Sequence, residues 1–208
     1  FKIGHTVGEK AQKLYDPKGK GQVIDAQKEG FEAAFARSTA LLASSQPIFE
    51  AGFKAGGALA FADVMLPKLK AGQRTWRMIE VKSSTSVKDY YRDDVAIQAF
   101  VAKTAGVPLS SIVLAYIDST WVYPGGDDYD GLLREEDLTK EAFARESEVK
   151  AWISEAQTIA AKRKEPKKET GSHCSDPYEC GFLGYCQGQE PQAQYPVQWL
   201  PRIQSNAL

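Results

Sequence analysis

The sequence has no long apolar run and no excess of charge of either sign. No stretch approaches the roughly 20 apolar residues that a membrane helix needs, and the N-terminus lacks the basic, apolar and small-residue order of a signal peptide. Its 26 basic and 27 acidic residues give a net charge of −1, so no overall positive field indicates a nucleic-acid partner. A local basic groove remains compatible with this balance. We expect a cytoplasmic protein without a membrane partner.

The sequence also lacks a methionine at its start and a capping residue ahead of its first helical pattern. It begins at Phe1, and a proline-punctuated apolar stretch, 191–208, ends it. We expect both ends to be cuts in a longer protein. The 208 residues, 43% of them hydrophobic, suffice for one main core. We place this domain at 1–165, a cysteine-bearing segment packing on it at 166–190, and a linker toward a missing C-terminal region at 191–208.

Apolar periodicity predicts alternating helices and strands. Asp25 is the expected N-cap of one helix, and Gly56-Gly57 is the expected tight turn of a hairpin. The basic segment 66–74 is expected to be a loop. We predict helices at 4–15, 25–43, 89–105 and 138–164, and strands at 48–55, 58–65, 75–84 and 111–123. The pattern predicts an α/β fold with a mixed central sheet flanked by helices.

Charged residues interrupt two of the predicted strands. Asp63 lies in one apolar run, and Glu80 and Lys82 lie in another. Residues i and i+2 of a strand share a face, so Glu80 and Lys82 point the same way. If the strands are antiparallel neighbours, Asp63 and Glu80 repel unless a proton or cation lies between them. Mg²⁺ or Mn²⁺ is the economical answer, because these ions take one or two carboxylates together with substrate phosphate oxygens.

A simpler interpretation exists for these charges. An isolated Glu-x-Lys is usually an exposed ion pair at a sheet edge, worth at most about 1 kcal/mol. Under that interpretation Asp63 merely ends a strand. The context decides between the two, because an aspartate, a hairpin, a Glu-x-Lys and a helix carrying Gln98 follow one another.

This combination resembles the PD-(D/E)xK nuclease superfamily and, within it, the RecB-type exonuclease branch. The matching runs are "FADVM", "MIEVKSS" and "DDVAIQAF". The resemblance implies a restriction-endonuclease-like core in which Asp63 and Glu80 bind metal and the Val81 carbonyl adds a ligand. It implies that Lys82 activates or positions water and that Gln98 orients Lys82 or substrate.

The branch also tends to carry a G-x-x-x-H element on an early helix. In this sequence a glycine, Gly8, stands where that histidine is expected. Glu9 or His5 is therefore the candidate for a further metal ligand, against the alternative of a solvated helix face. Glu50 is another acidic candidate on a neighbouring strand, although a surface charge is the favoured interpretation for it.

Aromatic and basic residues near the motif suit a nucleic-acid substrate. Lys88, Tyr90, Tyr91 and Arg92 begin the helix that carries Gln98, and aromatic faces beside cations can stack on bases and hold phosphates. The alternative is a mixture of core and solvated surface. Lys68, Lys70 and Arg74 could likewise contact a phosphate backbone, although basic loops are common without function.

The three cysteines lie close together near the C-terminus. Cys174, Cys180 and Cys186 are separated by five residues each, and His173 precedes the first. In a reducing compartment such clusters bind metal more often than they form disulfides. The adaptation nucleases of CRISPR systems hold an iron–sulfur cluster through one cysteine ahead of the core and three near the C-terminus. The resemblance, which extends to an uncharacterised bacterial family with a nuclease-like N-terminal domain, covers about residues 1–190. It implies a 4Fe–4S cluster bound by these cysteines in a longer protein.

The sequence therefore predicts a Mg²⁺- or Mn²⁺-dependent deoxyribonuclease that acts on single-stranded DNA or duplex ends. The reaction would be phosphodiester hydrolysis at a divalent ion, with Lys82 nearby. A rival interpretation is a non-catalytic nucleic-acid-binding or scaffolding module of the same fold. A third is a zinc-stabilised interaction domain, in which the cysteines hold zinc.

Overall fold

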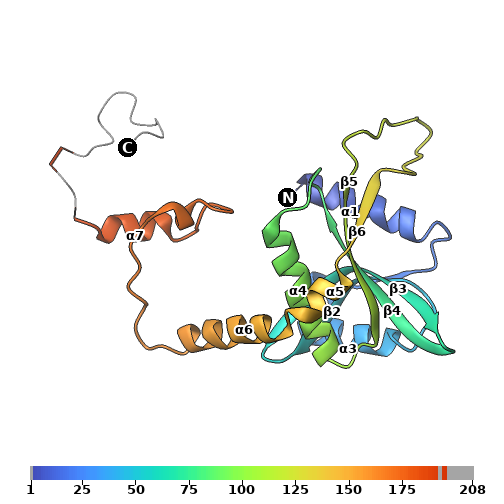
Figure 1. Cartoon of the computed structure of the whole chain (residues 1–208), viewed down its shortest axis with the longest axis horizontal. Coiled ribbons are helices and arrows are strands. Elements are labelled where there is room, and N and C mark those ends of the chain that lie inside the picture. Colours follow the sequence, from blue (N-terminus) through green and yellow to red (C-terminus); the bar gives the residue numbers. More distant parts are fainter. Residues whose placement is uncertain (1, 192–193, 196–208) are drawn as a thin grey trace. The chain divides into compact units, whose positions relative to one another are not determined.

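Six strands form one sheet in the part of the chain that this computed structural model describes, residues 2–191 and 194–195 (Figure 1). Neighbours along the chain are neighbours in the sheet. The β1–β2 and β4–β5 pairs are parallel and the other three are antiparallel. The strands are β1 Gln22–Val23, β2 Ile48–Ala55, β3 Ala58–Lys70, β4 Gln73–Lys82, β5 Leu109–Ile117 and β6 Leu133–Asp137. This confirms the expected α/β fold with a mixed central sheet.

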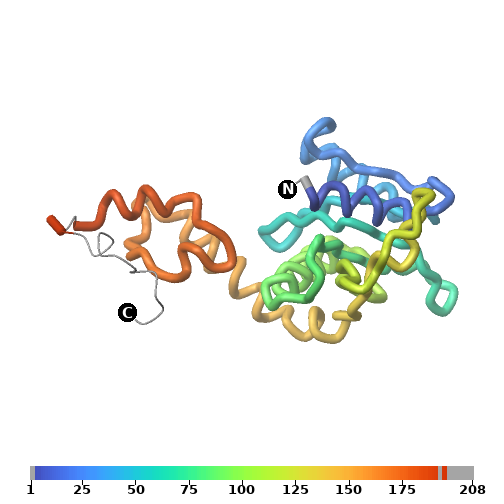
Figure 2. Tube along the Cα trace, turned by 90° about the horizontal axis from the view of Figure 1, so that it is seen from above, coloured from blue at the N-terminus to red at the C-terminus, as the bar shows by residue number. Residues whose placement is uncertain are grey.

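Helices cover both faces of the sheet, with α1 on one side and α4 on the other (Figure 2). Successive side chains of β4 point to opposite faces of the sheet. Trp76 and Met78 point into the larger buried cluster, which includes much of α4. Ile79 points into a smaller cluster, against which Tyr15 of α1 packs. The helices of this part are α1 Lys2–Tyr15, α2 Ala26–Glu29, α3 Phe31–Leu41, α4 Asp89–Thr104, α5 Thr139–Ala144 and α6 Glu146–Ala160.

Two helices that the sequence predicts as continuous are each broken. The helix expected at 25–43 is interrupted at Gly30, whose φ of 85° and ψ of 151° are not helical. Asp25 nevertheless caps it as expected, because its side chain accepts a hydrogen bond from the Lys28 N–H. The helix expected at 138–164 is interrupted at Arg145. Periodicity did not reveal either break because the apolar pattern runs on through both.

The strand boundaries also differ from expectation. The segment predicted as a basic loop forms the end of β3 and the start of β4. The turn between them is confined to Ala71 and Gly72, which have positive φ. β5 ends at Ile117 rather than at 123. β6, with the sequence LREED, was not predicted because an edge strand needs little apolar surface. The hairpin turn at Gly56-Gly57 is confirmed, with φ of 62° and 80°.

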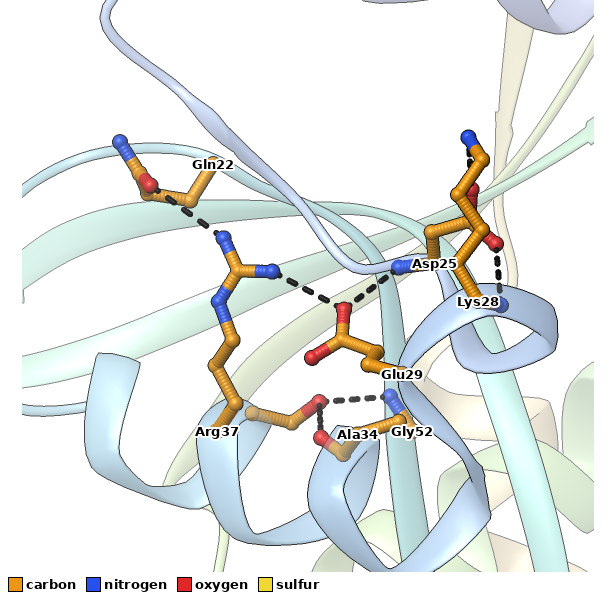
Figure 3. A network of polar contacts seen from close by, with 8 residues as sticks. Gln22, Asp25, Lys28, Glu29, Ala34, Arg37 and Gly52 are labelled. Atoms are coloured by element: carbon orange, nitrogen blue, oxygen red, sulfur yellow. Dashed lines mark hydrogen bonds and ion pairs between the residues drawn. The ribbon is translucent and has the colours of Figure 1, made fainter.

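A buried serine fastens α3 to β2, and its two partners, Ala34 and Gly52, are labelled in Figure 3. Ser38 is fully buried, donates to the carbonyl oxygen of Ala34 at 2.7 Å, and accepts from the Gly52 N–H at 2.9 Å. β1 pairs with β2 only at Ile48 and Phe49, so the Gly52 N–H lies beyond that pairing. The hydroxyl therefore satisfies a donor that the sheet leaves unpaired.

Replacing Ser38 by Ala is expected to lower the free energy of unfolding by about 1–3 kcal/mol, because the buried Gly52 N–H loses its acceptor. Urea unfolding would measure the change. Thr39→Ala is the matched control, since that hydroxyl bonds only to Phe35 within its own helix and its loss should cost less than about 0.5 kcal/mol. Equal effects of the two substitutions would contradict the assignment.

The remaining part of the chain forms a separate unit, and the division lies between 161 and 162. Its described elements are a 3₁₀ turn, Ser172–Cys174, and α7, Leu183–Gln189. Glu190 accepts hydrogen bonds from the backbone and hydroxyl of Thr170, and the Tyr185 hydroxyl donates to Glu165 at 2.7 Å. The predicted linker 191–208 lies outside the described residues except for 191, 194 and 195. Among the described helices, none has the length and apolarity to cross a membrane.

Candidate functional site

Strand register brings three carboxylates to one level of the sheet. Glu50 of β2 and Asp63 of β3 lie opposite each other, between the pairs Phe49–Val64 and Ala51–Ala62. Asp63 and Glu80 each lie one residue beyond the last β3–β4 pair at that end of the ladder, Val64–Ile79. The sequence predicted this meeting of Asp63 and Glu80 on neighbouring antiparallel strands.

Asp63 is held at the junction of β3 and β4. Its carboxylate accepts a hydrogen bond of 2.7 Å from the Val81 N–H. Burial raises the pKa of Asp63 from its usual 3.8 to about 6, with the charge of Glu50 adding to the rise, while the Val81 hydrogen bond and Lys82 oppose it. The charge of Asp63 raises the pKa of Glu80 in turn. The two acids therefore lie close enough for their charges to interact.

Glu80 is the most enclosed of the acids, with only 6% of its surface exposed. One carboxylate oxygen accepts from the Lys82 ammonium and the other from the Gln98 amide, each at 2.7 Å. Burial and the charge of Asp63 raise the pKa of Glu80 well above its ordinary value, although Lys82 lowers it. A buried carboxyl whose ionisation is opposed in this way can be stabilised as an anion by additional positive charge.

Lys82 lies between two carboxylates and an aromatic ring. Its Nζ is 2.7 Å from Glu80 and 2.5 Å from Asp94, and 5.3 Å from the ring centroid of Tyr91. Burial acts to lower the pKa of Lys82, but Glu80 and Asp94 outweigh it, so its pKa lies above the ordinary value. Lys82 is therefore a positively charged donor at neutral pH.

One face of α4 completes the arrangement. Tyr91, Asp94 and Gln98 are spaced i, i+3 and i+7 and lie on the same side of the helix. The sequence singled out Tyr91 and Gln98 but missed Asp94. In the sequence, the Asp93-Asp94 pair resembles solvated surface. The signal that could have identified Asp94 is its position one helical turn before Gln98. Asp94 contacts a residue 12 positions away, which periodicity does not show.

The sequence favoured a surface charge at Glu50, and the structure corrects that interpretation. Glu50 is partly buried, and burial followed by the charge of Glu80 raises its pKa. Its φ of 56° places it in the left-handed region, which costs a non-glycine residue about 1 kcal/mol or more. Strand β2 thus departs from regular geometry directly opposite Asp63.

The predicted substrate-binding residues have different surroundings. Lys88 is exposed and its Nζ lies 5.6 Å from the ring centroid of Tyr90 and 6.0 Å from that of Tyr91. The two tyrosine rings pack edge to face, with centroids 4.5 Å apart. Arg92 instead pairs with Glu136 of β6 and Glu141 of α5. The structure thus brings Lys88 and the tyrosines together near Lys82, and turns Arg92 toward the acids of β6 and α5.

The other candidates lie on exposed surfaces. Glu9 and His5 are exposed on α1, and the prediction of a metal ligand there stays a prediction. Lys68 and Lys70 are exposed near the tip of the β3–β4 hairpin. Arg74 bonds to the Ala43 carbonyl and the Ser45 hydroxyl, and so ties the hairpin to the segment before β2.

The two carboxylates of Asp63 and Glu80 are donors that suit a hard divalent cation. No group of three or more His, Cys, Asp and Glu side chains in the described residues is arranged to hold a metal ion. Mg²⁺ and Mn²⁺ commonly take only one or two protein carboxylates and fill their remaining positions with water and phosphate oxygens. The Gln98 side-chain oxygen is buried and without a hydrogen-bond partner, so an acceptor for such a water is available beside Glu80. Val81 contributes its N–H to Asp63, and a role for its carbonyl stays a prediction.

The cysteines are all free, with Cys174 buried and Cys180 and Cys186 partly buried. The Cys180 N–H donates to the Cys174 carbonyl at 2.7 Å, which keeps this short segment folded back on itself. The three thiols are not among groups arranged to hold a metal ion in the described part of the chain. Cluster binding in a longer protein stays a prediction.

Comparison with known proteins adds little to this geometry. No family model and no curated protein matches the chain. A solved structure described as "Crystal structure of SSO0001" aligns over 76% of this chain and 73% of that chain, with 11% identity and a TM-score of 0.30. A likeness that distant carries no functional argument.

Proposed function

We propose that this protein is a Mg²⁺- or Mn²⁺-dependent deoxyribonuclease with a restriction-endonuclease-like core of the PD-(D/E)xK type. The observation that carries the proposal is the convergence of Asp63, Glu80 and Lys82 where the β3–β4 ladder ends, with Gln98 reaching Glu80 from α4. An exposed ion pair at a sheet edge does not account for it, because Glu80 is almost fully buried and isolated buried carboxylates are costly.

Each residue of the motif has a task that its surroundings define. Asp63 and Glu80 would hold the cation, which supplies polarisation of the scissile phosphate and activation of water. Lys82 is a fixed positive charge where negative charge accumulates on the phosphate during attack. Gln98 orients Glu80 through the amide hydrogen bond and leaves its oxygen to accept from water.

DNA is the proposed substrate, as a single strand or a duplex end. Lys88, Tyr90 and Tyr91 support this part of the proposal, since they form a basic and aromatic surface at the start of α4 close to Lys82. Bases stack on exposed aromatic rings in a sequence-tolerant manner, and the ammonium of Lys88 suits a backbone phosphate.

Replacing Lys82 by Ala is expected to abolish cleavage of single-stranded and duplex DNA in Mg²⁺ or Mn²⁺ while the fold is retained. The physical reason is the loss of the positive charge that stabilises the phosphate during attack. A gel assay on end-labelled DNA and a circular dichroism spectrum would measure the two properties. Lys150→Ala, at an exposed position of α6, is the matched control. Undiminished cleavage by the Lys82 variant would refute the assignment.

A non-catalytic nucleic-acid-binding or scaffolding module of the same fold is the second candidate. One observation favours it: both oxygens of Glu80 already have protein partners, Lys82 and Gln98. A cation at Glu80 must therefore compete with the lysine. Calorimetric titration with Mn²⁺ separates the candidates, since the nuclease requires binding that depends on Asp63 and Glu80, whereas a scaffold does not.

A further inference from the structure

We propose that Asp94 is a positioning residue that holds the Lys82 ammonium when a divalent cation occupies Glu80. The inference rests on the proposed function and deepens it, because it explains how one carboxylate can serve both a lysine and a metal ion. Asp94 lies within the matching run "DDVAIQAF", but the resemblance gives it no role, and its role is argued only from its contacts.

The Lys82 ammonium bridges two carboxylates of different exposure. Its Nζ lies 2.7 Å from Glu80 and 2.5 Å from Asp94. The Glu80 side chain is 7% exposed and the Asp94 side chain is 43% exposed. The lysine thus has one partner inside the site and one at its rim.

A cation at Glu80 would repel the ammonium, because two positive charges cannot share one carboxylate oxygen without cost. If Glu80 were the only partner, Lys82 would either exclude the cation or lose its fixed position. Asp94 removes this conflict, since it already bonds to the same Nζ and lies outside the Asp63–Glu80 pair. The ammonium can then keep one charged hydrogen bond while Glu80 turns to the cation.

The position of Asp94 on α4 makes this arrangement rigid. Asp94 lies one helical turn before Gln98, which bonds to Glu80, and one turn after Tyr91, whose ring is beside the ammonium. The buried residues Val95, Ala96 and Ala99 fix this part of α4 against the sheet. The Lys82 side chain therefore extends from the end of β4 to one face of α4.

The test is Asp94→Asn, which keeps the shape of the side chain and removes its charge. We expect the Mn²⁺ concentration for half-maximal cleavage to rise about tenfold and kcat at saturating Mn²⁺ to fall about tenfold, in line with second partners of metal-site residues. KM for DNA should be unchanged. Asp94→Glu should restore most of the loss. Asp93→Asn is the charge-matched control, because Asp93 pairs with Arg145, and its activity should stay within about twofold.

A second measurement does not depend on cleavage. Calorimetric binding of Mn²⁺ is compared for the wild type, Asp94→Asn, Lys82→Ala and the double variant. If Asp94 acts through Lys82, Asp94→Asn weakens Mn²⁺ binding about tenfold when Lys82 is present. When Lys82 has been replaced by Ala, adding Asp94→Asn weakens binding no more than adding Asp93→Asn does. An equal loss in both backgrounds would show that Asp94 acts by its own charge, and would overturn the inference.

The outcomes separate this inference from the proposed function. A wild-type protein that cleaves DNA, together with an Asp94→Asn variant of unchanged kcat and Mn²⁺ dependence, would overturn the inference alone. A wild-type protein that neither binds Mn²⁺ nor cleaves DNA would overturn the proposed function, and the role of Asp94 with it.

Discussion

Replacing Asp63 by Asn is expected to remove activity and to make the protein more stable. Cleavage should fall by roughly a thousandfold or more, since several kcal/mol of phosphate polarisation are lost with the cation. At pH 7 the metal-free variant should be more stable than the wild type by about 3 kcal/mol, the value that corresponds to a pKa raised from 3.8 to about 6. Cleavage assays and urea unfolding in the presence of a chelator would measure the two effects.

The physical reason is that the fold opposes the ionisation of Asp63. Burial and Glu50 raise its pKa, and an amide of the same shape has no charge to bury while its oxygen can still accept from the Val81 N–H. Asp118→Asn is the control, and its expected effect on the free energy of unfolding has the opposite sign. Hydrogen bonds from Thr120, together with Arg134, lower the pKa of Asp118, so its neutralisation should destabilise the protein. A destabilised Asp63→Asn variant would contradict the account of the site.

The stabilisation that Mn²⁺ provides is expected to increase steeply between pH 5 and pH 7.5. Protons and the cation compete for Asp63 and Glu80, whose pKa values are both raised, and a ligating carboxylate must be deprotonated. At pH 7.5 a hundredfold excess of Mn²⁺ over its Kd should add about 2.7 kcal/mol to the free energy of unfolding. At pH 5 the gain should be close to zero. Thermal unfolding with and without Mn²⁺ across this range would measure it.

The metal-free protein should show the opposite dependence on pH at this site. Because the folded pKa of Asp63 is about 6 and the unfolded value is 3.8, the folded state binds the proton more tightly. The contribution of protonated Asp63 to the stability of the fold is therefore complete below pH 3.8 and is lost as the pH rises through 6. The difference between wild type and Asp63→Asn isolates this contribution from other acids. A Mn²⁺ effect that is independent of pH, or that persists in the variant, would place the ion elsewhere.

The sequence predicted the layout of the sheet better than the ends of its elements. Alternating apolar residues located β2, the start of β3 and β4, and Gly56-Gly57 located the turn between the first two. The end of β3 and the start of β4 were missed because Lys68 and Lys70 are exposed charges, and exposed charges resemble a loop in composition. Gly30 was missed as a helix break, since one glycine inside an apolar periodicity is often tolerated.

The candidate site was predictable where it depends on strand register and unpredictable where it depends on packing. Asp63 and Glu80 meet because a tight antiparallel hairpin fixes which residues are opposite. Glu50 was undervalued because the left-handed conformation of that residue and its burial have no signature in "PIFEAGF". Asp94 was missed because its contact with Lys82 arises from the docking of a helix on the sheet, which no local pattern encodes.

Helix α4 connects β4 to β5 and so makes that strand pair parallel. The same helix supplies Asp94 and Gln98. A newly made chain that had formed only the β2–β3–β4 meander would already carry Asp63 opposite Glu80, with Lys82 beside them. It would lack the carboxylate that draws the lysine aside and the amide that orients Glu80. The proposed metal site would then be complete only once α4 has docked on the sheet, so the proposed cleavage of DNA would depend on a finished topology.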